Sequence, residues 1–248
     1  MLHSPKRGKT ADQCYHMAKN RKLKIHRVDP ILINGKHKEG FTGFNPFKID
    51  PSLTDKALAT TITAQATNFA TVVQSIYDQS GVSDPYFSSL NETVTVSIAE
   101  LLMLTYHLVH PGRVPKASDV QNLINNFLND PLVRDVFEAE ETVDIDKALE
   151  YGEVIILNYA LERGDSVATG FGLFFLLSYE TTVLRRPGSE NDRIKNFIYI
   201  DELPVLLHPK LQSFFMLFRQ YRVAVICAIQ TLDQVKKIQL DSIIPHLK

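Results

Sequence analysis

The chain contains 248 residues, of which 44% are hydrophobic, and its 27 Lys and Arg nearly balance its 28 Asp and Glu. This apolar fraction is enough for a core and excludes an intrinsically disordered chain, and the length allows one large domain or one domain with an insertion. The start, MLHSPKRGKT, lacks the apolar segment of a secretory signal peptide. The two cysteines, Cys14 and Cys227, lie far apart in sequence, so we expect reduced intracellular thiols.

Charge is segregated along the chain. Residues 1–48 carry 11 Lys/Arg against 3 Asp/Glu, residues 49–150 carry 5 against 15, and residues 151–248 carry 11 against 10. This pattern predicts a distinct acidic segment inserted between two others. The basic first segment is compatible with a position near nucleic acid and equally with a solvated surface.

The first segment contains a partial phosphate-loop motif, Gly8-Lys9-Thr10. The full motif requires a glycine five residues before Gly8, where His3 stands, and a buried strand before that. The bulky residues Pro, Lys and Arg at positions 5–7 also occupy places that should be free to turn their amides toward a phosphate. We therefore interpret Thr10 as the start of a helix that ends at residues 20–22, followed by a strand over 23–28 and a glycine-rich loop.

The acidic segment has a helical pattern from Thr54, which is a suitable N-cap, to residues 80–81. Further helices are predicted over 91–110, from Ser118 through 128, and over 132–137, so this segment resembles a small helical bundle. His107 and His110 are spaced to share a helix face and could ligate a metal. No Cys or further His is near in sequence, so we interpret them as cations at a helix C-terminus.

Strand and helix alternate from Val154 to Ile229. Apolar runs predict strands over 154–157, 197–200 and 223–229, while a helix capped at Asp165 and another opening at Pro209 lie between them. The first of these helices is apolar nearly all round, which predicts burial, and its Ser178 and Glu180 argue against a membrane span. The alternation favours a right-handed, mostly parallel sheet in which the three strands lie side by side.

Polar residues follow two of the predicted strands. Asp201 and Glu202 come directly after the run 197–200, which suits a strand covered on both faces. In open α/β sheets the carboxyl ends of the strands face the ligand crevice, where a Mg²⁺-bound phosphate and an attacking water would lie. Gln230 and Thr231 end the next strand at the same edge, and a glutamine there can contact a γ-phosphate or orient a water. A polar turn and a helix-capping Gln230 remain open alternatives on this pattern alone.

An ordered set of motifs runs along nearly the whole chain. It consists of SPK, TAD, VDP and GFNPF, then a helical segment, then YGEVIILNYAL, GFGLFFLLSYETTVLRRPG, FIYIDELPVL and LFRQYRVAVICAIQTLDQ. This set resembles the conjugative coupling proteins of the TraG/TraD kind, which are the DNA-transfer ATPases of type IV secretion. The resemblance implies an α/β fold with a RecA-like P-loop NTPase core and a mostly parallel sheet. An all-α insertion domain over 51–150 would separate the two parts of the motor, 1–50 and 151–248.

The resemblance also implies functional residues and partners. Asp201 and Glu202 would be the Walker B pair, with Asp201 binding Mg²⁺ through water and Glu202 activating the attacking water. Gln230 would be a catalytic and nucleotide-binding residue, and the cofactors would be ATP and Mg²⁺. Members of this family work as membrane-anchored hexamers at the cytoplasmic side of the plasma membrane. They move single-stranded DNA together with a relaxase and secretion-channel proteins.

The start of the chain departs from the family pattern. In the family, the element that Ser4-Pro5-Lys6 resembles follows the P-loop, so we expect this chain to be a soluble internal fragment that is inactive alone. VirB-type secretion ATPases and FtsK/HerA-like DNA translocases share the same core and remain alternatives. A further alternative is a non-catalytic scaffold in which the acidic helices dock a basic relaxase.

Overall fold

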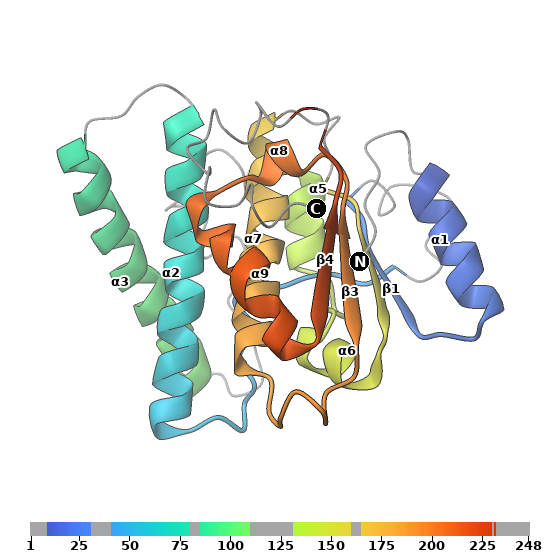
Figure 1. Ribbon diagram of the computed structural model, residues 1–248. Helices are drawn as coiled ribbons and strands as arrows, with labels where there is room; N and C mark the ends of the chain where they lie inside the picture. The colour runs from blue at the N-terminus through green and yellow to red at the C-terminus, as the bar shows by residue number, and fades with distance from the viewer. Residues whose placement is uncertain are drawn as a thin grey trace.

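The computed structural model describes residues 9–30, 41–79, 85–109, 131–159, 165–229 and 231. Figure 1 shows the arrangement of its elements. In chain order they are α1 (Lys9–Asn20), β1 (Ile25–Val28), α2 (Asp55–Gln79), α3 (Pro85–Val109), α5 (Pro131–Phe137), α6 (Ile145–Tyr151), β2 (Val154–Leu157), α7 (Asp165–Arg185), β3 (Asn196–Ile200), α8 (Leu203–Leu206), the 3-10 turn Pro209–Leu211, α9 (Gln212–Leu217), the 3-10 turn Phe218–Tyr221 and β4 (Val223–Cys227).

The four strands form two parallel pairs. β1 pairs with β2, and β3 pairs with β4. The prediction that the strands of residues 154–157, 197–200 and 223–229 share one sheet is therefore wrong, because β2 belongs to a different pair from β3 and β4. The last strand also ends at Cys227, two residues earlier than predicted.

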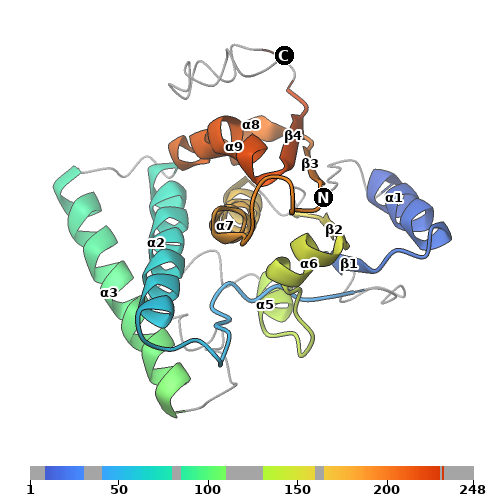
Figure 2. The same cartoon turned by 60° about the horizontal axis from the view of Figure 1, so that its bottom comes forward.

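Side-chain hydrogen bonds connect the β3 segment to residues on either side of β2. At the start of β3, Asn196 Nδ2 donates to the carbonyl of Leu149 in α6, the helix before β2, at 3.2 Å. Beyond the ends of β2 and β3, the Tyr159 hydroxyl donates to the Asp201 carbonyl at 3.2 Å. β2 and β3 are therefore linked just beyond the points where both strands end, and their neighbouring positions are visible in Figures 1 and 2.

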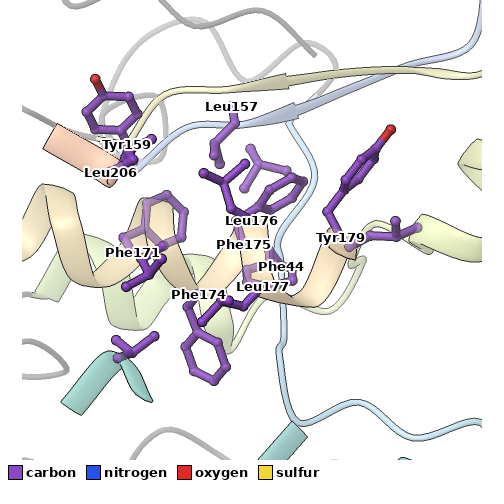
Figure 3. Close-up of a cluster of buried hydrophobic side chains, with 14 of the residues drawn as sticks. Phe44, Leu157, Tyr159, Phe171, Phe174, Phe175, Leu176, Leu177, Tyr179 and Leu206 are labelled. Atoms are coloured by element: carbon purple, nitrogen blue, oxygen red, sulfur yellow. The ribbon is translucent and has the colours of Figure 1, made fainter. Parts of the chain in front are cut away.

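Helix α7 is the centre of the core, as its uniform apolar sequence predicts. Its aromatic and aliphatic side chains are almost completely buried, with Phe171, Phe174 and Phe175 packed as in Figure 3. The stretch Val167–Arg185 is long and apolar enough to cross a membrane by length and composition, but 72% of it is buried inside the protein. That burial identifies α7 as a core helix.

The helices of the acidic segment pack on α7 and on one another. α2 lies between α3 and α7 in both views (Figures 1 and 2), and buried α2 residues such as Phe69 belong to the same core as Phe174. α3 begins at Pro85, six residues earlier than predicted, and the helix predicted from Ser118 lies outside the described residues. α6 was not predicted; it is capped by Asp144 and ends at Gly152, which has a left-handed φ of 68°.

The outer faces of the two strand pairs differ. α1 covers β1 and β2 through Ala11 and Tyr15, which pack on Ile156, whereas Met17 of the same helix is exposed. On the β3–β4 pair, Phe197 (54% exposed), Tyr199 (40%) and Ile226 (42%) face outward. The prediction that this strand is covered on both faces is therefore wrong for the described residues, since α7 and α8 cover only the side of Ile198 and Ile200.

Candidate functional site

Polar residues from three strands meet at one edge of the protein. Asp29 follows β1, Asn158 follows β2, and Asp201 follows β3. Asn158 Nδ2 donates to Asp29 Oδ1 at 3.1 Å, and both side chains are buried. Since β1 and β2 are parallel in register from Ile25 to Val28, their carboxyl ends must lie together, and this hydrogen bond fixes them there.

The turn after β3 holds the two predicted carboxylates, Asp201 and Glu202, which are both half-buried. Glu202 occupies the N-cap position of α8 with φ 54° and ψ 46°. A left-handed backbone in a residue with a Cβ costs roughly 1–2 kcal/mol, and such residues concentrate at functional sites. The Leu203 amide, which donates to the Ala228 carbonyl at 3.2 Å, ties this turn to the end of β4.

Helix α7 packs against the turn after β3 through Thr169 and Gly172. Thr169 Oγ1 donates to the Val205 carbonyl at 3.1 Å. Gly172 allows the close approach of the two helices, because a Cβ at this position would lie 2.6 Å from Leu206 Cδ2 and 3.1 Å from Tyr159 Cβ. The buried glycine therefore lets α8 and Tyr159 pack against the same turn of α7.

Tyr159 is the direct link between the end of β2 and the acidic turn. Its side chain is fully buried, and its hydroxyl donates to the backbone carbonyl of Asp201. Burial raises the pKa of Tyr159, and the nearby carboxylates of Glu202 and Asp201 raise it further. The hydroxyl therefore stays protonated at neutral pH and remains a hydrogen-bond donor.

The chemistry of the turn suits Mg²⁺ better than a transition metal. Carboxylate oxygens are the ligands that Mg²⁺ prefers, and Mg²⁺ usually takes only one or two of them together with waters and substrate phosphates. Within the described part of the chain, no group of three or more His, Cys, Asp or Glu could form a closed metal cage. His107 is half-buried near the end of α3, while His110 lies outside the described residues. Asp201 has the ligand chemistry for a Mg²⁺ ion that also binds waters and a phosphate.

The remaining predicted residues are placed as follows. Gln230 lies outside the described residues, and Thr231 is exposed. Gly8 is also outside them, while Lys9 begins α1, which agrees with the prediction of a helix at this position. Tyr159 was not among the predicted site residues; its position two residues after the apolar run of β2 is the one local signal it has.

A cavity of about 1070 Å³ lies elsewhere in the molecule, between the loop before α2, α6 and the second half of α7. Its walls carry both signs of charge, and some of these charges pair with each other, as Lys147 does with Asp144 and Arg185 with Asp146. Neither Asp201 nor Glu202 lines it. We therefore place the candidate site at the strand ends and not in this cavity.

Comparison with solved structures identifies proteins of similar fold. The unbound form of the bacterial conjugative coupling protein TrwBdeltaN70 is 15% identical, with a TM-score of 0.55, and the match covers 99% of this chain and 65% of that one. Plasmid coupling protein TrwB in complex with the GTP analogue GDPNP is 14% identical, and its complex with the ATP analogue ADPNP is 15% identical. Both complexes have a TM-score of 0.55, with 99% of this chain and 66% of theirs covered. Neither a protein-family model nor a curated protein matched the sequence.

The predicted likeness to conjugative coupling proteins is thus confirmed at the level of fold. The chain has an α/β fold with short parallel strand pairs, similar to that of a nucleotide-binding coupling protein. It spans less than two thirds of the length of these structures.

Proposed function

We propose that this chain is part of an ATP-driven, DNA-translocating coupling protein of conjugative transfer and type IV secretion. The observation that carries the proposal is the turn of Asp201 and Glu202, which stands at the carboxyl end of a parallel strand in a fold similar to TrwB. Ligands of open α/β sheets bind at this end of the strands.

The proposed roles follow from the chemistry of the residues. Asp201 holds Mg²⁺ through water, and Glu202 positions or deprotonates the attacking water. Gln230, which follows β4 in the sequence, contacts the γ-phosphate. Bound Mg²⁺ would neutralise charge on the phosphates of ATP. The left-handed backbone of Glu202 at the end of a parallel strand supports this assignment, since strained residues concentrate at functional sites.

The wider assembly is part of the same proposal. Residues 1–50 and 151–248 form a RecA-like motor domain, and residues 51–150 form the all-α insertion. The complete protein is a homo-hexamer anchored at the cytoplasmic side of the plasma membrane, and it moves single-stranded DNA that a relaxase and secretion-channel proteins hand on. The similarity of the fold to a conjugative coupling protein supports this assembly.

Substitution of the two carboxylates in the full-length gene product tests the proposal. Glu202→Gln keeps the shape of the side chain but removes the base, so ATP hydrolysis should fall by roughly 10²–10⁴-fold with nucleotide affinity kept. Asp201→Asn should also weaken Mg²⁺-dependent nucleotide binding. DNA transfer between cells should fail in both variants.

The scaffold alternative makes the opposite forecast. It expects normal DNA transfer by both variants, and loss of relaxase docking when charge is reversed at acidic helix residues such as Glu92 and Asp135, which are exposed. Near-normal ATP turnover by Glu202→Gln would end the catalytic assignment.

A further inference from the structure

Tyr159 comes two residues after the end of β2. Its hydroxyl spans from one strand pair to the other and donates to the Asp201 carbonyl at 3.2 Å. The ring is fully buried beside Leu206 (Figure 3) and lies against Gly172 of α7. The ring and the hydroxyl of Tyr159 are therefore both held by the protein, so this side chain can restrain the turn after β3.

The peptide that Tyr159 holds is the one between Asp201 and Glu202. Its conformation is constrained because Glu202 has a left-handed backbone. The rest of the turn is anchored separately, by the Leu203 amide on the Ala228 carbonyl and by Thr169 on the Val205 carbonyl. The Tyr159 bond acts one residue before the strained position, so it restrains the direction in which the Glu202 side chain leaves the turn.

The Tyr159 hydroxyl donates its hydrogen to a backbone carbonyl, that of Asp201. A peptide carbonyl takes up no proton in catalysis, so this contact holds the peptide and does not make Tyr159 a general acid or base.

We propose that Tyr159 is a positioning residue for Glu202, holding the Asp201–Glu202 peptide so that the Glu202 carboxylate is aimed at the water it activates. This proposal rests on the proposed function of the acidic turn. It predicts that loss of one hydroxyl, which acts through a backbone carbonyl, slows the chemical step without changing how tightly nucleotide binds.

The test is Tyr159→Phe in the full-length protein, which removes the hydroxyl and keeps the ring. The matched control is Tyr179→Phe, because Tyr179 is also a buried tyrosine but lies in the second half of α7, where its ring is tilted against Phe218, away from Tyr159 (Figure 3). Loss of a single neutral hydrogen bond corresponds to about a tenfold change in rate. We expect kcat for ATP hydrolysis to fall roughly tenfold in Tyr159→Phe, with KM for ATP within about twofold of wild type. Tyr179→Phe should keep both values.

Amide hydrogen exchange on the same variants supplies a second readout. Exchange should quicken at the amides of Glu202, Leu203 and Val205 in Tyr159→Phe and stay at the wild-type rate in Tyr179→Phe. Exchange that quickens throughout the chain would show a general stability role and overturn the proposal. The proposal would also be overturned if Tyr159→Phe and Tyr179→Phe had the same kcat and the same exchange rates while Glu202→Gln abolished turnover. If Glu202→Gln itself retains turnover, the proposed function of the turn is wrong, and the positioning role goes with it.

Discussion

Glu202 combines a strained backbone with the carboxylate that we propose as the catalytic base. Its φ of 54° suits glycine, yet the residue at this position has a carboxylate at the edge where parallel strands bind ligands. Lys22, Asp55 and Arg222 also have a positive φ, so the strain supports the proposed role only together with the position of Glu202 after β3.

Replacing Glu202 by glycine should separate stability from function. We expect Glu202→Gly to keep or raise the free energy of unfolding, by about 1 kcal/mol at most, because glycine adopts this backbone without strain. ATP hydrolysis by the full-length protein should nevertheless be lost. Denaturant unfolding and turnover assays on the same preparation check both parts.

Lys22 provides the matched control for this substitution. It also has a left-handed φ, of 58°, but it lies in the exposed turn after α1. Lys22→Gly should be equally neutral or stabilising while retaining turnover. A clear loss of stability in Glu202→Gly would contradict the view that the backbone of Glu202 is strained.

At the scale of elements, the junction of α2, α7 and α9 contains a half-buried carboxyl, that of Glu180. Glu180 of α7 accepts a hydrogen bond from the Ser213 hydroxyl of α9, and Lys210, just before α9, donates to Thr71 of α2. Burial raises the pKa of Glu180 to about 7, against an opposing effect from the charge of Lys210. The ordinary pKa of a glutamate is 4.5.

The sign of the pH dependence follows from this shift. Between about pH 4.5 and 7 the folded protein holds a proton at Glu180 that the unfolded chain has released, so folding is favoured at low pH and stability falls as pH rises through this window. Glu180→Gln should remove this slope and stabilise the protein at pH 8 by about 3 kcal/mol at most. Denaturant unfolding from pH 4 to pH 8 measures the effect.

Glu150→Gln, at an exposed position of α6, is the control and should keep the wild-type slope of unfolding free energy against pH. An unchanged slope in Glu180→Gln would refute the assignment.

Elements with a strong local signal were predicted from sequence, and elements defined by distant partners were not. The periodic apolar residues of α2 and the uniform apolar sequence of α7 are properties of one segment, so both helices could be placed. α6 was missed because it has only seven residues, and its cap at Asp144 and its end at Gly152 are its main signals. The division of the strands into two pairs depends on tertiary contacts that no single segment contains.

The same distinction applies to the candidate site. Asp201 and Glu202 could be proposed because two carboxylates directly follow an apolar strand. Tyr159 could not, since its importance depends on a hydrogen bond to a residue 42 positions away. The hydrogen bond between Asn158 and Asp29 joins residues even further apart in the chain, so only the fold reveals it.

At the scale of the whole molecule, the proposed nucleotide site requires two kinds of group, one for the metal ion and one for the phosphates. The acidic turn supplies carboxylates, which can bind a metal ion but repel the phosphates of ATP. Phosphate binding in such motors needs backbone amides at a glycine-rich loop and a lysine. Gly8-Lys9-Thr10 is the nearest approach to that motif in this sequence, and it lacks the glycine at position 3. Lys9 instead begins a helix whose Ala11 and Tyr15 pack on the outer face of the β1–β2 pair.

We therefore expect this 248-residue chain to bind ATP weakly by itself. A titration with labelled ATP and Mg²⁺ should show no saturable site at micromolar concentrations, which would correspond to about −8 kcal/mol of binding free energy. Lys9→Ala should leave the titration unchanged, and a charge-matched control, Lys19→Ala at the other end of α1, should behave identically. If the chain instead showed a micromolar site that disappeared in Lys9→Ala but persisted in Lys19→Ala, Lys9 would be a phosphate ligand despite the missing glycine. The start of α1 would then have to bind the phosphates of the nucleotide whose metal Asp201 holds.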